Sequence, residues 1–296
     1  MDDVIIVGGS FAGLSAALQL GRARRRVTVL DTGLPRNRYA AHAHGLLGHD
    51  GKPPTQILAE GRAQLGRYPS VRLLDVAATA LAGTRDAFTV TTAAGENLAA
   101  RRLILSYGIT DVFPDIEGFA QCWGRSVLHC PYCHGFEVAD GRLGLLYSSP
   151  LSLHAMALLH DWSARLTLFT NGQDLPEAEH AKLARRGVAI VTGRVAGIDH
   201  RDGHLSSIRI EQGDPVPLDA LFAHPRQRLA ADLHGALGLD LTEGPLGELI
   251  AVGDDFQTSL PGVYAAGDLA HPMQSAHLAL SRGSMAGVHC HQSLIV

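Results

Sequence analysis

The chain is poor in cysteine and has no long apolar run. Four cysteines in 296 residues are too few for the disulfide scaffold of a small secreted protein. No stretch of eighteen or more residues is apolar throughout, which excludes an ordinary transmembrane helix. The sequence also begins without the basic segment of a signal peptide. We therefore expect a soluble cytoplasmic protein that does not bind a membrane.

Clustered positive charge is missing as well. The formal net charge is -4 at pH 7, and the only basic run, Arg24-Arg25-Arg26, is short enough to be a solvated helix end. This balance argues against nucleic acid as a partner. The chain is 46% hydrophobic and 18% charged, so it can bury a large core, and its length exceeds one typical domain. Two domains are the expectation.

The N-terminal segment follows the order strand, glycine turn, helix, strand. Residues 4–7 are an apolar β-type run, Gly8-Gly9-Ser10-Phe11-Ala12-Gly13 makes the turn, and residues 14–21 continue with helix formers. Residues 27–30 give a second strand that ends on Asp31, eighteen residues after the turn. This spacing is typical of a dinucleotide-binding fold, in which an acid at this point binds a ribose.

Each glycine of this turn has a physical reason. Gly8 permits the tight turn, and Gly13 lets helix and strand pack closely, so that the helix N-terminus faces a pyrophosphate. Ser10 stands where such motifs carry their middle glycine, and binding requires that its small Cβ be tolerated. The alternative is a glycine turn that binds no nucleotide.

A second unit of this kind is predicted in the middle of the chain, with strands at residues 143–147 and 166–169 and a helix at 151–162. Its turn, Ser148 to Ser152, contains no glycine, which puts close approach of a pyrophosphate to the backbone in doubt. No basic cluster or acid follows the second strand. A purely structural unit that binds nucleotide weakly or not at all is the alternative.

Other elements are predicted around these two units. We expect a helix at residues 55–68, strands at 71–74, 88–92 and 102–105, and hairpin turns marked by Gly83 and Gly95.

The C-terminal region is predicted to be a strand followed by a helix. The strand, residues 261–268, ends in Gly267-Asp268, and the helix spans 274–295. The N-terminus of such a helix stabilises negative charge, as would develop on the pyrimidine edge of a reduced flavin. Asp268 would suit a ribityl hydroxyl.

The segment His129-Cys130-Pro131-Tyr132-Cys133-His134-Gly135 holds two cysteines that can close and open a disulfide. It also matches c-type haem attachment, which would need export. Structural zinc would need a second ligand pair, and Cys122 and Cys290 are solitary. A glutaredoxin-like site would need a long helix where residues 135–141 are rich in glycine. Chance pairing of buried cysteines is the remaining alternative, but in a reducing compartment a redox-active pair is favoured.

Taken in order, the N-terminal turn with Asp31, the Cys130-Pro131-Tyr132-Cys133 motif and the terminal Gly262 to Asp268 segment resemble the thioredoxin reductase family of small flavoproteins, over nearly the whole chain. The resemblance implies an α/β fold with two Rossmann-like, three-layer ββα dinucleotide-binding domains. The FAD-binding domain would be discontinuous, formed by residues 1–115 and 248–296. Residues 116–247 would form an NAD(P)-binding-like domain that carries the cysteine pair. A homodimer is expected.

Two departures point to one branch of this family. His134 follows the second cysteine where thioredoxin reductases usually have aspartate, and Cys130 to Gly135 is similar to the active site of the gliotoxin- and holomycin-type dithiol oxidases. Ser106-Tyr107-Gly108 stands where the family usually has Ala-Thr-Gly. The glycine-free turn around Ser148 puts NADPH use in doubt, although Pro150 and His154, which relatives in this branch also carry, leave an unconventional nucleotide site open.

The resemblance assigns roles to individual residues. Cys133 would exchange electrons with the flavin, Cys130 would meet the substrate, and His134 would be the acid/base, unless it only packs or caps a helix. No metal is expected. The residues expected to bind FAD are Gly8, Ser10, Phe11, Ala12, Gly13, Asp31, Arg38, Ala77, Gly108, Gly267, Asp268, Gln274, Ser275 and Ala276.

The sequence therefore predicts an FAD-dependent thiol-disulfide oxidoreductase that acts on a small dithiol or disulfide, or on a thioredoxin-like protein. Two alternatives remain. One is a conventional NADPH-dependent thioredoxin-disulfide reductase, and the other is a flavin-binding redox sensor with little turnover.

Overall fold

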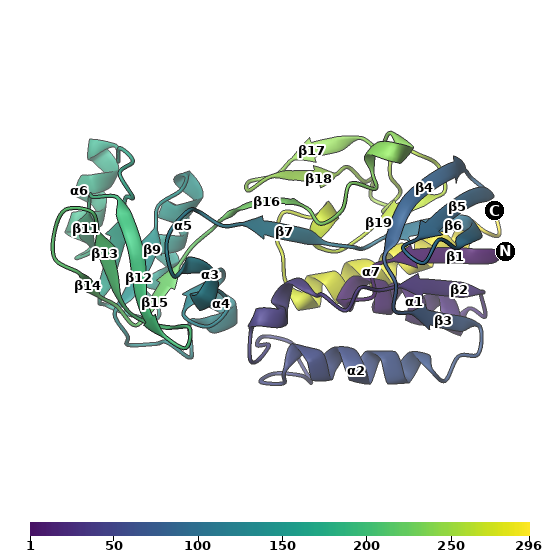
Figure 1. The fold of residues 1–296 in the computed structure, drawn as a ribbon, viewed down its shortest axis with the longest axis horizontal. Coiled ribbons are helices and arrows are strands. Elements are labelled where there is room, and N and C mark those ends of the chain that lie inside the picture. The colour runs from purple at the N-terminus through teal and green to yellow at the C-terminus, as the bar shows by residue number, and fades with distance from the viewer. The chain divides into compact units, whose positions relative to one another are not determined.

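The computed structural model describes all 296 residues, and the chain forms two compact units. Unit 1 consists of residues 1–38, 52–110 and 227–296, and unit 2 consists of residues 39–51 and 111–226. The chain crosses between the units at residues 38–39 and 51–52, and again within β7 (Ile109–Val112) and β16 (Arg226–Leu229), which pair with each other as a two-stranded ribbon (Figure 1).

Unit 1 is built on a seven-stranded sheet with the strand order β3-β2-β1-β6-β5-β4, to which β19 adds beside β6. The strands β1, β2, β3, β6 and β19 run parallel, and β4 and β5 form an antiparallel extension. The elements of unit 1 are β1 (Asp2–Val7), α1 (Phe11–Arg22), β2 (Val27–Leu30), η1 (Arg36–Tyr39, whose last residue lies in unit 2), α2 (Pro54–Leu65), β3 (Val71–Leu74), β4 (Ala78–Thr84), β5 (Ala87–Thr92), β6 (Asn97–Leu105), η2 (Gly235–Leu237), β17 (Leu241–Glu243), β18 (Glu248–Ile250), β19 (Val263–Ala265), η3 (Asp268–Ala270) and α7 (Ala276–Gln292).

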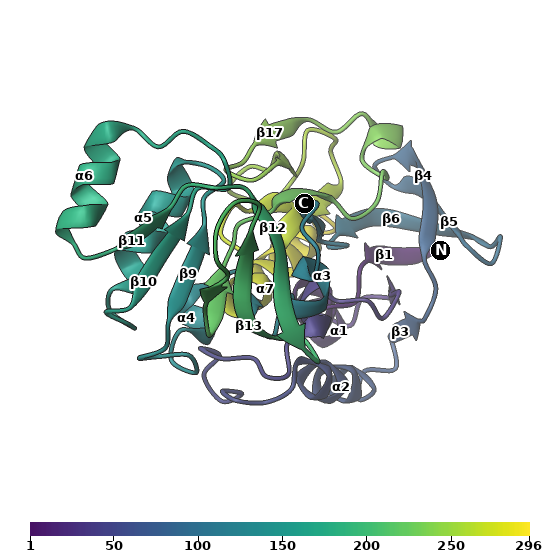
Figure 2. The same ribbon diagram turned by 60° about the vertical axis from the view of Figure 1, so that its left-hand side comes forward.

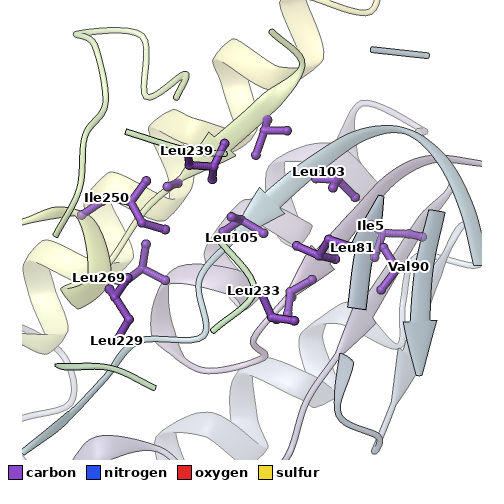
Figure 3. Packing of buried hydrophobic residues seen from close by; sticks show 14 of the residues in the cluster. Ile5, Leu81, Val90, Leu103, Leu105, Leu229, Leu233, Leu239, Ile250 and Leu269 are labelled. Carbon is purple, nitrogen blue, oxygen red and sulfur yellow. The ribbon is translucent and has the colours of Figure 1, made fainter. Parts of the chain in front are cut away.

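Strand β1 is buried on both faces, which explains its continuous apolar sequence. Val4 and Ile6 pack into one core, which includes residues of α1 and α7. Ile5 and Val7 point to the opposite face and join a second core with β4, β5, β6 and the segment after β16 (Figure 3). The alternation of side chains along a strand therefore divides unit 1 into layers on both sides of the sheet.

Helices α1 and α7 pack with their backbones in close contact (Figures 1 and 2). A Cβ added at Gly283 would lie 2.1 Å from the carbonyl oxygen of Ala12, and one added at Gly287 would lie 2.8 Å from that of Ala16. The two glycines of α7 therefore let the C-terminal helix approach α1 more closely than any larger residue would allow.

Unit 2 contains a five-stranded parallel sheet with the order β11-β10-β9-β15-β8 and a separate antiparallel sheet, β12-β13-β14 (Figure 2). Its elements are α3 (Phe119–Cys122), β8 (Val127–Leu128), α4 (Pro131–His134), β9 (Leu143–Leu146), α5 (Pro150–Leu159), β10 (Leu166–Phe169), α6 (Glu177–Arg185), β11 (Ala189–Val191), β12 (Val195–Arg201), β13 (His204–Ile210), β14 (Val216–Pro217) and β15 (Ala220–Phe222). The predicted α/β class is confirmed, with parallel strands in each unit.

The structure places two segments differently from the boundaries expected from sequence. Residues 227–247 belong to unit 1, because Leu229, Leu233 and Leu239 lie in the same core as Ile5. Residues 39–51 belong to unit 2, although unit 1 flanks them on both sides in the sequence. The expected hairpin turn at Gly83 is wrong: Gly83 lies inside β4 with a positive φ of 103°, and the turn follows at Arg85 and Asp86.

None of the helices combines the length and the apolar character that a membrane crossing requires.

Candidate active site

The two cysteines of the central motif lie at the start of the one-turn helix α4. Cys130 is the N-cap residue with an extended backbone, and Pro131 occupies the first helical position, where a missing N–H has no consequence. The amide of Cys133 donates to the carbonyl oxygen of Cys130 over 3.2 Å. This turn brings the two Sγ atoms to 2.6 Å from each other. A disulfide bond is about 2.05 Å long, so the pair can be oxidised with a small movement.

His134 ends α4 next to this pair, and its imidazole is largely withdrawn from solvent. Both ring nitrogens are buried and have no hydrogen-bond partner. Burial lowers the pKa of His134 below its ordinary value of 6.5, against the opposing effect of the Glu137 carboxylate, and His44 lowers it further. The imidazole is therefore neutral at neutral pH and can accept a proton.

His129, which directly precedes Cys130, packs against another histidine, His224. The rings of His129 and His224 meet edge to face, with centroids 5.2 Å apart, and His129 also lies 6.4 Å from the ring of Trp123. His224 hydrogen-bonds to the backbone of His129, and burial lowers the pKa of His224. These contacts hold the backbone immediately before Cys130.

Two aromatic side chains, one in the motif and one directly after it, are exposed. Tyr132 is 71% exposed and Phe136 is 85% exposed. Tyr132 packs edge to face on Trp162 at 5.5 Å, and a Cβ at Gly135 would lie 2.8 Å from the indole nitrogen of that tryptophan. The α4 turn is thus packed on Trp162, which follows α5, while apolar surface borders the cysteine pair.

In unit 1, the glycines of the N-terminal turn are required by close backbone contacts. Gly8 has a φ of 107°, and its added Cβ would lie 2.3 Å from the carbonyl oxygen of Ser106. A Cβ at Gly13 would lie 1.8 Å from the carbonyl oxygen of Gly8. Ser10 is the N-cap residue of α1 but makes no side-chain cap, so no side chain caps the first N–H groups of the helix. This is the arrangement that receives a pyrophosphate.

Asp31 lies at the carboxyl end of β2, against the same turn. A Cβ at Gly9 would lie 2.6 Å from the Cβ of Asp31. The carboxylate accepts a hydrogen bond from Arg62 of α2 at 3.1 Å and one from the amide of Gly33 at 3.2 Å. The predicted ribose-binding acid is therefore next to the turn, and its partner Arg62 was not identified from the sequence.

The C-terminal motif meets the N-terminal turn within unit 1. A Cβ at Gly267, whose φ is 89°, would lie 3.0 Å from the Cβ of Ala12. Asp268 begins η3 and pairs with Arg36 at 3.7 Å. Arg38, the residue of this stretch that is predicted to contact FAD, donates to the carbonyl oxygen of Pro35 at 3.0 Å.

The remaining residues expected at the FAD site lie elsewhere in unit 1. Ser275 caps α7 by accepting from the amide of Leu278, and Ala276 is the first residue of that helix. Gln274 exchanges amide hydrogen bonds with Gln227. The carbonyl oxygen of Gly108 accepts from Ala230, and that of Ala77 accepts from Ala93 in the β-hairpin layer.

The turn of the second βαβ unit is closed by its own side chains. Ser152 is fully buried, and its hydroxyl accepts from the amide of Ser148 at 3.1 Å. Pro150, the first residue of α5, has no N–H to offer. Of the amides that would face a second pyrophosphate, the one in the turn at Ser148 is therefore already bonded, and the first helical position has none.

Together, a glycine cradle at an uncapped helix and a dithiol turn beside a neutral histidine define a redox enzyme that binds a dinucleotide cofactor. The chain matches the pyridine nucleotide-disulphide oxidoreductase family over residues 2–283 and belongs to that family. It is 34% identical to thioredoxin reductase tcpT of Claviceps purpurea, with 96% of this chain and 92% of the relative covered.

Two solved structures have the same fold. The chain is 43% identical to an oxidoreductase from Agrobacterium tumefaciens, with a TM-score of 0.95 and coverage of 99% and 98%. It is 35% identical to HlmI, with a TM-score of 0.92 and coverage of 99% and 92%. The predicted relationship to the thioredoxin reductase family is confirmed, and the protein is an FAD-dependent disulfide oxidoreductase that acts on dithiols or disulfides.

The residues present fit FAD. Gly8 and Gly13 let the turn close tightly on its own backbone in front of α1, the first turn of α1 has no side-chain cap, and Asp31 is adjacent. No group of three or more histidine, cysteine or acidic side chains is arranged to hold a metal ion.

Proposed function

We propose that this protein oxidises small dithiols, and that electrons pass from the substrate through Cys130 and Cys133 to FAD. The observation that carries this proposal is the difference between its two nucleotide-type turns. Neither helix has a side-chain cap, but the turn before α1 is built on glycines, whereas the turn before α5 has neither glycine nor a free amide at Ser148. Binding of FAD is thus favoured over strong binding of NADPH.

The reaction is a pair of thiol-disulfide exchanges. A substrate thiolate attacks Sγ of Cys130 in the oxidised pair, the bond between the two cysteine sulfurs breaks, and Cys133 leaves as a thiolate. The second substrate thiol then attacks the sulfur of the mixed disulfide, which releases a substrate disulfide and the Cys130 thiolate. FAD, when bound by the residues of unit 1, would supply the acceptor for the electron pair of the reduced cysteines, and oxygen or another electron acceptor would reoxidise it.

His134 would accept the proton that an attacking thiol releases in these steps and return it to a leaving sulfur. Only the thiolate is the nucleophile, and an ordinary thiol with a pKa near ~8.5 is mostly protonated at neutral pH. The neutral imidazole, whose two nitrogens have no other partner, would accept the proton of the attacking thiol. It would return a proton to the leaving sulfur when the exchange runs in reverse.

The cofactor would be held in unit 1. Gly8, Ser10 to Gly13 and Asp31 would bind the pyrophosphate and ribose, while Gly267, Asp268 and the N-terminus of α7 would face the flavin end. Arg38, Ala77 and Gly108 are proposed as further contacts. Unit 1 would thus be the FAD-binding domain and unit 2 the NAD(P)-binding-like domain with the cysteine pair. A cytoplasmic homodimer is part of the proposal.

The second candidate is an NADPH-dependent thioredoxin-disulfide reductase. It is favoured by the similarity of this chain to proteins described as thioredoxin reductases, such as thioredoxin reductase tcpT. In this case electrons would pass in the opposite direction, from NADPH through FAD to the cysteines and then to a thioredoxin-like protein.

Anaerobic bleaching of the flavin absorbance distinguishes the candidates. We expect a small dithiol such as dithiothreitol to bleach it rapidly, and NADPH to bleach it slowly or not at all. Rapid bleaching by NADPH, followed by transfer of electrons to thioredoxin, would establish the reductase instead. Bleaching by neither reagent would favour a redox sensor with little turnover.

The Cys133→Ser variant tests the route of the electrons. It is expected to keep bound FAD and to lose bleaching by the dithiol, because no intramolecular disulfide can form. Cys130→Ser is the companion variant and should lose the same reaction. Retained bleaching in either variant would refute passage through the pair.

A further inference from the structure

We propose that His44 is a positioning residue for the redox site, which holds Glu137 and through it sets the charge that faces His134. His44 lies on the segment of residues 39–51, and no motif of the sequence pointed to it. The inference rests on the proposed acid/base role of His134. It adds to that role a second histidine and a carboxylate, joined to the site from a distant part of the sequence.

Residues 39–51 form a loop of unit 2 that is held in place by hydrogen bonds within the loop. Its chain closes on itself through a hydrogen bond from the amide of Gly51 to the carbonyl oxygen of Ala43 at 2.9 Å. Asp50 accepts from the amide of Gly45 at 2.8 Å, and Leu46 is buried. These contacts fix the backbone on both sides of His44.

His44 bridges two carboxylates. Its Nε2 lies 3.4 Å from Oε1 of Glu137, and its Nδ1 lies 3.7 Å from Oδ1 of Asp50. The side chain of His44 is 21% exposed and that of Glu137 is 38% exposed, so the contact is partly screened from water. The loop therefore places the imidazole of His44 beside Glu137, which follows His134 by three residues.

Two charged groups shift the pKa of His134, Glu137 on its own segment and His44 on the 39–51 loop. His44 itself faces Glu137, Asp50 and the ring of His42, whose centroid is 6.3 Å away. The balance between Glu137 and His44 thus sets the local field.

The two groups act on His134 in opposite directions. The carboxylate of Glu137 stabilises the protonated imidazole and raises its pKa, whereas His44 lowers it. When protonated, His44 also neutralises Glu137 and so weakens the effect of that carboxylate. Loss of Glu137 should therefore make His134 harder to protonate, and loss of His44 should make it easier.

The test compares Glu137→Gln, His44→Gln and the control His42→Gln in the FAD-loaded protein. His42 is exposed, lies on the same loop and makes no ion pair with Glu137. The first readout is the ring-proton NMR titration of His134, with its signal assigned from His134→Asn. The second is the pH dependence of flavin bleaching by dithiothreitol, in which the acidic limb reports protonation of His134.

We expect the midpoint of His134 to fall by about 0.5–1 pH unit in Glu137→Gln and to rise by about the same amount in His44→Gln. The acidic limb of the bleaching rate should move in the same directions, and His42→Gln should leave both unchanged. A purely structural role would lower the rate without moving the two midpoints apart. Midpoints that stay fixed, or that move in the same direction, would overturn the inference.

Failure of the proposed function gives a different result. If His134 is not the acid/base, His134→Asn retains the acidic limb of the wild-type profile. If only the present inference fails, His134→Asn loses that limb while the Glu137 and His44 variants keep the wild-type midpoint.

Discussion

Replacement of Gly13 by alanine tests whether the close packing of the N-terminal turn is needed for FAD binding. The added Cβ would lie 1.8 Å from the carbonyl oxygen of Gly8 and 2.8 Å from the hydroxyl oxygen of Ser106. The first distance is about 1.5 Å short of an ordinary contact. Both neighbours are held, because the Ser106 hydroxyl also donates to the Gly8 carbonyl at 2.8 Å. The first turn of α1 must therefore move away from β1.

This movement has two measurable effects. Overpacking of this kind lowers the free energy of unfolding by about 1–3 kcal/mol, and the better helix propensity of alanine returns at most about 1 kcal/mol. Displacement of the N-terminal amides removes at least one hydrogen bond to a charged phosphate, which is worth about 1.5–3 kcal/mol. We expect the Kd for FAD to rise at least about tenfold.

Urea unfolding and calorimetric titration of apoprotein with FAD measure the two effects. Gly61→Ala is the matched control, because it also lies inside a helix, α2, and its Cβ would meet only Leu14 at 3.4 Å. The control should keep its FAD affinity and gain up to about 1 kcal/mol of stability. A Gly13→Ala protein with wild-type affinity and stability would refute the reasoning.

Two further predictions concern stability. Arg102 is 1% exposed and binds Asp86 at 2.8 Å and the carbonyl oxygen of Ser293 at 2.6 Å. In urea unfolding, Arg102→Met should therefore lower the free energy of unfolding by about 2–4 kcal/mol, whereas the control Arg101→Met should change it by less than about 1 kcal/mol. Equal losses in the two variants would contradict this role of Arg102. Burial lowers the pKa of His224, so the stability that its neutral form contributes is present above the ordinary value of 6.5 and is lost as pH falls below it. His224→Gln should therefore lose less stability than the wild type between pH 7.5 and 5.5, and parallel pH curves would refute this assignment.

Local patterns were sufficient to predict the parallel α/β units. The continuous apolar run of β1 and the glycine spacing before α1 are local properties, so strand, turn and helix could be placed within a few residues. The same holds for the second unit, where the predicted strands at 143–147 and 166–169 correspond to β9 and β10. The glycine-free turn around Ser148 was also evident, although its closure by Ser152 required the structure.

Partners distant in sequence could not be predicted from such patterns. Arg62 reaches Asp31 from α2, and Arg36 pairs with Asp268 across more than two hundred residues. A charged side chain at the surface has no periodicity that identifies its partner, so the pairing of Arg36 with Asp268 could not be predicted. The same limitation applies to residues 227–247, which are predicted to lie in the central domain although their leucines pack in the core of unit 1.

The chemistry of this protein could be predicted from the chain alone, because the two-residue spacing of Cys130 and Cys133 and the glycines of the first turn act over a few residues, where covalent geometry sets the distances. His134 was identified for the same reason. What surrounds that histidine depends on the fold. The 39–51 loop folds onto unit 2 and places His44 beside Glu137, near the buried ring nitrogens of His134. The charge that an imidazole experiences depends on distance in space rather than along the chain, so the sequence alone does not reveal this arrangement.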